Sequence, residues 1–153
     1  MSVGMERIQR LLAVSDLSPL GDAGVRQAAR AALGETISAK QLPLLVKQCL
    51  AAHDPADAAV AWRALKGASI RMPDRDECAA ELAKAVSNAS PAAQAQLVDV
   101  LAAVGGANAL NAMGAAMKGG DDQVLDSGTR ALGNWMEVDA APLLLDLAEN
   151  AKG

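Results

Sequence analysis

A catalytic or metal site needs several ionisable groups in one place, and the single histidine of this 153-residue chain, His53, stands alone. It directly precedes Asp54 in an expected turn, with no serine or cysteine nucleophile pattern nearby. Spaced cysteine and histidine ligands for zinc are missing, and so is a glycine-rich loop for phosphate. We therefore expect a solvated loop histidine, no cofactor, no metal ion and no enzyme activity.

Clustered carboxylates are the next candidates for chemistry. Helix dipoles stabilise acids in a first turn, so helix capping is the favoured interpretation and an ion or catalytic site is the alternative. The cluster consists of Asp74, Asp76, Glu77 and Glu81. The same interpretation applies to the separate pair Asp121-Asp122.

Two cysteines, Cys49 and Cys78, are expected on the first helices of consecutive helix pairs, so they could be neighbours. Free cysteine behaves as a small apolar residue, and two buried thiols are favoured over a disulfide.

Trp62 and Trp135 could stack on a ligand, since aromatic residues are otherwise absent. Core packing is the favoured role for both.

Composition favours an all-α fold. The chain is 52% hydrophobic, with no Phe or Tyr, so alanine and leucine supply most of the apolar surface. Alanine suits helices and lets neighbouring helix axes approach closely, whereas the residues that strands need are scarce.

The net charge of −4 argues against a nucleic-acid or anionic-membrane binder. Residues 100–117 carry no charge, but Gly105-Gly106 interrupts them, so a membrane span is disfavoured.

Apolar residues recur at three- and four-residue spacing, which predicts amphipathic helices. Their expected starts are marked by capping residues. Asp54-Pro55 and Ser90-Pro91 each combine a cap with proline at the first helical position, and Ser38 with Gln41 forms a capping-box pattern for a helix over about 39–52.

Glycines mark the expected helix ends. The doublets at 105–106 and 119–120 stop two helices, and Gly34 is expected in a left-handed conformation after a helix over 23–33. We predict one domain over 1–153. It comprises helix pairs at about 4–33, 38–70, 74–104 and 107–135, and a ninth, terminal helix at 139–150.

The chain also resembles itself. Residues 22–48 and 121–147 align at one offset of 99, which pairs Val25 with Val124 and Ala32-Leu33-Gly34 with Ala131-Leu132-Gly133. Three periods of 33 make up this offset, and 33 residues is the length of a pair of short antiparallel helices. We predict stacked helix pairs in which Val25 and Val124 occupy equivalent buried positions.

These residues resemble HEAT repeats, the armadillo-like α-solenoid family. The D-x-x-V followed by A-L-G in residues 22–34 and 121–133 is similar to the second HEAT helix, and residues 96–148 look like HEAT segments of bacterial secreted multidomain proteins. Residues 97–101 depart from the pattern of their neighbours. The resemblance implies a right-handed α-α superhelix that binds or spaces other proteins.

We therefore expect a non-catalytic module that binds a protein partner or positions a neighbouring domain through the concave surface of its second helices. The alternatives are a DNA alkyl-base glycosylase-like enzyme, which needs a cationic groove and aromatic side chains, and a purely structural spacer. Separately solvated side chains are the favoured interpretation for Arg63, Asp99 and Arg130, and an alternating ladder across three repeats is the alternative hypothesis. The candidate contacts are Arg26, Arg30, Arg63, Lys66, Gln94, Asp99, Gln123 and Arg130.

The expected ninth helix has no partner, and its three consecutive leucines, 143–145, cannot all face the preceding pair. We predict that at least one points away and that this end is covered by the chain's own tail, by a second copy or by a further domain. The early charges at Glu6, Arg7 and Arg10 do not fit an export signal, so the chain as written is expected in the cytoplasm. A fragment of a larger exported protein would instead lie in the periplasm or outside the cell.

Overall fold

The structure is a computed structural model and describes residues 23–135 and 140–150. The first expected helix, 4–14, lies outside the described residues. Within them the fold is all-α, with no strand. The helices are α2 (Ala23–Thr36), the 3₁₀ helix η1 (Ala39–Gln41), α3 (Leu42–Ala51), α4 (Pro55–Arg71), α5 (Arg75–Val86), α6 (Pro91–Val104), α7 (Ala107–Gly119), α8 (Asp122–Gly133) and α9 (Ala141–Asn150).

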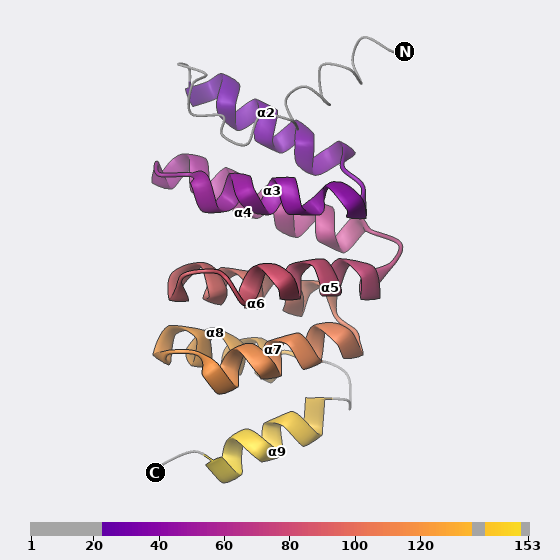
Figure 1. The fold of residues 1–153 in the computed structure, drawn as a ribbon, viewed down its shortest axis with the longest axis vertical. Helices are drawn as coiled ribbons and strands as arrows, with labels where there is room; N and C mark the ends of the chain where they lie inside the picture. Colours follow the sequence, from indigo (N-terminus) through magenta and orange to yellow (C-terminus); the bar gives the residue numbers. More distant parts are fainter. Residues whose placement is uncertain (1–22, 136–139, 151–153) are drawn as a thin grey trace.

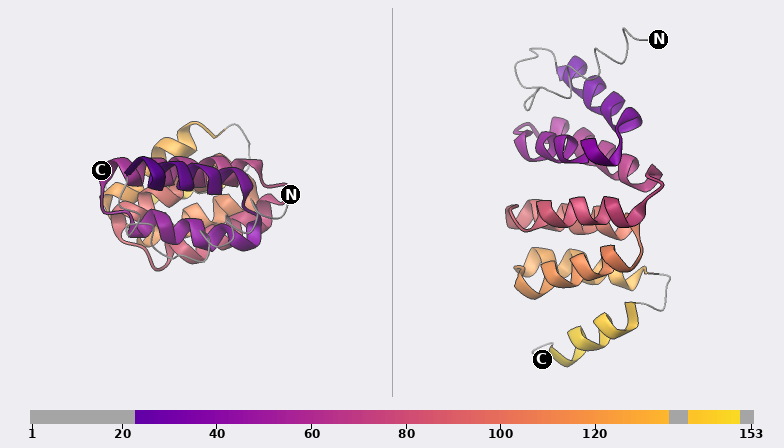
Figure 2. Two further views of the ribbon diagram at one scale, coloured as in Figure 1. Left: turned by 90° about the horizontal axis from the view of Figure 1, so that it is seen from above. Right: turned by 45° about the vertical axis from the view of Figure 1, so that its right-hand side comes forward.

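The helices stack in successive layers along the long axis of the molecule (Figure 1). Short connections make α3 and α4, α5 and α6, and α7 and α8 antiparallel neighbours. Seen from above, the stacked helices form two rows (Figure 2). The helices α2, α4, α6 and α8 contact one another in sequence, as do α3, α5 and α7.

Three helices begin where the capping residues predict. At the start of α4, the Asp54 carboxylate accepts hydrogen bonds from the backbone N–H groups of residues 56 and 57. At the start of α5, Asp74 accepts one from the backbone N–H of Glu77. Asp121 accepts two at the start of α8. These carboxylates satisfy N–H groups that have no partner inside their helix. Capping is thus the observed role of Asp74 within the acidic cluster and of Asp121.

The expected helix over 39–52 begins differently. Residues 39–41 form the tighter 3₁₀ turn η1, and α3 starts only at Leu42, with Pro43 in its first turn. Gln41 still reaches back, because its side-chain oxygen accepts the backbone N–H of Ser38 at 3.1 Å. Proline supplies no N–H for a helical bond, which favours a helix start at this point.

Gly34 does not end a helix, and that prediction was wrong. The helix α2 continues to Thr36, and the described residues with positive φ are Gly105 and Gly106, at the turn before α7. A Cβ on Gly34 would lie 2.8 Å from the Ala64 Cβ and 2.9 Å from the Ala64 carbonyl oxygen. Gly34 therefore permits the close approach of α2 to α4, and it does not mark the end of α2.

The core runs along the stack and consists mainly of leucine, alanine, valine and methionine. The predicted equivalence of residues 22–48 and 121–147 holds at Leu33 and Leu132, which are each 1% exposed. It fails at the valines, because Val25 is 54% exposed whereas Val124 is fully buried. Val124 packs at the turn between α7 and α8, where a Cβ on Gly120 would lie 2.7 Å from its side chain. The residues that would form the matching turn before Val25 lie outside the described residues.

Several smaller expectations are confirmed. Cys49 and Cys78 are free, buried thiols, and burial raises the pKa of Cys49 to about 12. Trp62 and Trp135 pack against the core. Leu144 and Leu145 on α9 are exposed, as predicted for at least one of the three leucines. None of the described helices is both long and apolar enough to cross a membrane.

Candidate functional site on the second helices

The expected interaction surface lies on the row α2, α4, α6 and α8. We call the exposed side chains of these four helices the second-helix surface. Successive helices of this row are joined by polar contacts, and each contact takes up groups that could otherwise meet a partner.

Between α2 and α4 the polar groups are buried. The Arg26 Nε donates a hydrogen bond to the Asp57 Oδ2 at 2.8 Å, and the Arg30 Nη1 lies 2.8 Å from the same oxygen as an ion pair. The Gln27 amide donates to the other oxygen, Oδ1, at 3.3 Å. The Arg26 hydrogen bond, with help from Arg30 and Gln27 and against the effect of burial, lowers the pKa of Asp57 to about 2. The carboxylate is thus held ionised between two guanidinium groups.

This cluster corrects two of the candidate contacts. The side chain of Arg30 is 1% exposed and that of Arg26 is 16% exposed, so both serve the α2–α4 interface. Buried charges require a partner, and Asp57, which was not among the sequence candidates, supplies it. A carboxylate 31 residues after an arginine was the signal that could have revealed the pairing.

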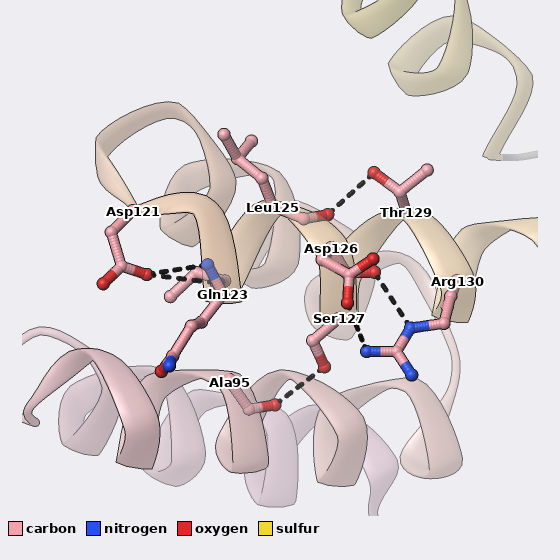
Figure 3. A network of polar contacts seen from close by, with 9 residues as sticks. Ala95, Asp121, Gln123, Leu125, Asp126, Ser127, Thr129 and Arg130 are labelled. Carbon is pink, nitrogen blue, oxygen red and sulfur yellow. Dashed lines mark hydrogen bonds and ion pairs between the residues drawn. The ribbon is translucent and has the colours of Figure 1, made fainter.

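Between α4 and α6 the contact lies at the surface. The Lys66 Nζ is 2.8 Å from an Asp99 carboxylate oxygen, and both side chains are about half exposed. The hypothesis of a ladder from Arg63 to Asp99 is therefore wrong, because Lys66, one helical turn further along α4, pairs with Asp99 instead. The other rung fails as well: Arg130 pairs with Asp126 on its own helix (Figure 3).

Between α6 and α8 the contact is neutral. The Ser127 hydroxyl donates to the backbone oxygen of Ala95 at 3.0 Å, 32 residues earlier (Figure 3). Small residues flank this contact on α6, where Ala92 and Ala95 line the surface. The two helices thus meet through small side chains, which leaves a groove between their longer ones.

That groove has two parts. The larger, of about 510 Å³, runs between α6 and α8, and the smaller, of about 350 Å³, continues toward α4. Both share Asp99, Ala131 and Asn134, so they form one surface, which we call the α6–α8 groove. Its polar lining residues are Lys66, Gln96, Asp99, Gln123, Asp126, Ser127, Arg130 and Asn134.

Four of the sequence candidates line the α6–α8 groove: Lys66, Asp99, Gln123 and Arg130. Arg63 is exposed on α4 outside it. The Gln94 amide instead donates to the Val86 backbone oxygen at 3.0 Å, which satisfies the carboxyl end of α5.

Sequence reasoning missed Gln96, Asp126, Ser127 and Asn134. Gln96 lies on α6. Asp126, Ser127 and the C-capping residue Asn134 share one stripe of α8 with Gln123 and Arg130, at spacings of three and four residues, so the helical period was the available signal for these three. The described residues contain no group of three acids, cysteines or histidines placed to hold a metal ion. The α6–α8 groove is thus lined by amide groups, a hydroxyl group, paired ionic groups and alanine side chains.

The chain was also compared with known proteins. Neither protein-family models, nor curated proteins, nor solved structures give a match. The HEAT-repeat resemblance therefore stays a prediction.

Proposed function

We infer that the protein is a non-catalytic interaction module that binds a protein partner, or a neighbouring domain, in the α6–α8 groove. The observation that carries this inference is the groove's exposed polar lining. Gln96 and Gln123 are exposed there, and their amide groups can both donate and accept hydrogen bonds. Such groups match the peptide groups and polar side chains of another protein.

The charge of the groove favours protein over nucleic acid. Its two described cations, Lys66 and Arg130, are each paired with a carboxylate, Asp99 and Asp126 respectively. A groove for DNA, as in the glycosylase alternative, needs unpaired positive charge along the phosphate backbone. The lining is balanced instead, which suits a partner of mixed polarity.

The same proposal includes a HEAT-like right-handed superhelix as the architecture. Its support is the regular spacing of the contacts between successive second helices. Arg26 and Asp57 are 31 residues apart, Lys66 and Asp99 are 33 apart, and Ala95 and Ser127 are 32 apart. A constant step of about one helix pair is what stacked repeats require.

A site-specific crosslinking experiment tests the proposed function. A photoreactive amino acid at Gln96, in the groove, is compared with one at Asn111, an exposed residue of α7 outside it. In lysate of the source cells we expect discrete adducts from position 96 alone. Those adducts should weaken when Arg130→Glu changes the groove's charge. Equal labelling at both positions, or no adduct at position 96, would contradict the proposal, and the second result would favour the structural spacer.

A further inference from the structure

A pocket lies at one side of the stack, where the chain passes from α4 to α5 (Figure 1). Its volume is about 310 Å³, which is near the lower end for sites that bind small molecules. Residues of η1, of the end of α4 and of the start of α5 line it. None of them lines the α6–α8 groove, so the pocket and the proposed partner site are separate and can fail independently.

Part of the lining of this pocket is apolar. Ala68 and Met72 line it and are 2% and 6% exposed, and Ile37 lines it while packing against the core. Apolar surface in a concavity gains free energy when a ligand displaces water from it. The pocket therefore favours a molecule with an aliphatic part over a simple ion.

Four charged side chains line the same pocket. Lys40 on η1 and Arg71 at the end of α4 supply two cations. Asp74 and Glu77 supply two carboxylates at the start of α5. None of the four takes part in an ion pair within the described part of the chain. The pocket thus holds both signs of charge on different elements, without neutralising them against each other.

Two of these charged groups already have structural roles. The Arg71 guanidinium donates hydrogen bonds to the backbone oxygens of residues 34 and 35, at the carboxyl end of α2. Asp74 caps α5 by accepting the backbone N–H of Glu77. The Lys40 ammonium and the Glu77 carboxylate are exposed and have no hydrogen bond or ion pair with the described residues. They are therefore the charged groups that a ligand can engage.

We propose that this pocket binds a free aliphatic amino acid. Its ammonium group pairs with Glu77, its carboxylate pairs with Lys40, and its side chain covers Ala68 and Met72. The small volume admits a molecule of few atoms, and a zwitterion matches a lining of two cations and two carboxylates. A simple anion or cation matches only half of that charge. The end of a peptide carries one of the two charges beside its terminal side chain, so it leaves Lys40 or Glu77 unpaired.

Titration of the whole chain with L-leucine, followed through its amide NMR spectrum, tests the proposal. We expect a dissociation constant between about 10 µM and about 1 mM, with the largest shifts at the amides of Lys40, Met72 and Glu77. Glycine should bind roughly tenfold more weakly or worse, because it lacks the apolar side chain. Leucinamide and N-acetyl-leucine, which represent the amino and carboxyl ends of a peptide, should weaken by about as much, because each lacks one charge. No shift up to about 10 mM L-leucine, or equal binding of any of these three probes, overturns the proposal.

Two variants test the charged groups without disturbing the core, because both side chains are exposed. Lys40→Ala and Glu77→Gln should each weaken L-leucine binding roughly tenfold. The matched controls are Lys47→Ala on α3 and Glu149→Gln on α9, which alter exposed charges outside the pocket and should leave binding unchanged. Thermal unfolding gives a second readout, since L-leucine should raise the Tm of the wild type and of both controls more than that of the two pocket variants. Unchanged affinity in either pocket variant, or equal weakening by a control, contradicts the proposal.

Discussion

At the scale of single residues, Gly34 determines how closely α2 and α4 approach. Gly34→Ala places a methyl group under 3 Å from the Ala64 Cβ and carbonyl oxygen, and a backbone atom cannot move aside cheaply. We expect a net loss of about 1–2 kcal/mol in the free energy of unfolding, because overpacking outweighs the higher helix propensity of alanine. Urea unfolding measures this loss.

The control for this substitution lies on the adjoining helix. Gly67 is inside α4 and exposed, and a Cβ there would meet nothing within 4 Å. Gly67→Ala should therefore stabilise the protein by about 0.5–1 kcal/mol through helix propensity alone. If the two variants shift the unfolding free energy in the same direction, the close approach at Gly34 is not what the glycine provides.

Asp57 gives the protein a pH dependence at the acid end. Its pKa is about 2 in the folded chain, below the value of about 4 for an unfolded aspartate. A carboxylate with a lowered pKa contributes stability above pH 4 and loses that contribution as the pH falls from about 4 to about 2. The difference in unfolding free energy between wild type and Asp57→Asn should thus shrink across this window, as measured by urea unfolding from pH 2 to 7.

Removing Arg26 provides the check on the cause. The Arg26 hydrogen bond is the largest influence on the Asp57 pKa, so Arg26→Ala should move the window toward the ordinary aspartate range. If the wild type and Asp57→Asn differ by a constant amount down to pH 2, the carboxylate does not gain its stability from these guanidinium groups.

At the scale of helices, the Lys66–Asp99 pair joins α4 to α6 at the surface. Both groups are about half exposed, so solvent screens their attraction, and a coupling of roughly 0.2–1 kcal/mol is expected. A double-mutant cycle with Lys66→Ala and Asp99→Ala measures it, and the coupling should fall as salt is added. The matched control cycle combines Arg63→Ala with Asp99→Ala and should show no coupling. A larger coupling energy for Arg63 with Asp99 than for Lys66 with Asp99 would support the Arg63–Asp99 ladder and contradict the observed pairing.

Helix positions were more predictable from the sequence than helix rotations. Caps such as Asp54 and Asp121 act locally, so they marked the starts of α4 and α8 correctly. The partner of Asp99 depends on how α4 and α6 are rotated against each other, and a shift of three residues exchanges Arg63 for Lys66. Side-chain pairing between helices is a tertiary property, which the period of one helix cannot determine.

At the scale of the whole molecule, the predicted layers agree with the described helices, but burial was not predictable from internal similarity. Val25 and Val124 align in the sequence and differ in exposure: Val124 is fully buried beside Gly120 at the turn between α7 and α8, whereas Val25 is 54% exposed. Leu45 and Leu144 differ in the same way, the first fully buried and the second 39% exposed. The burial of a residue in a stack depends on the contacts that neighbouring layers make with it, so residues that align in the sequence can differ in exposure.

This dependence on neighbouring layers predicts a gradient of local stability. The helix α6 has five buried residues and contacts helices on both sides of its row, whereas α9 has none buried. Opening of α9 exposes little apolar surface, so its amides should exchange with solvent hydrogen first, and those of α6 should exchange last, near the free energy of global unfolding. Native-state hydrogen exchange read by NMR tests this order. Equal protection of both helices would mean that the molecule opens as one cooperative unit.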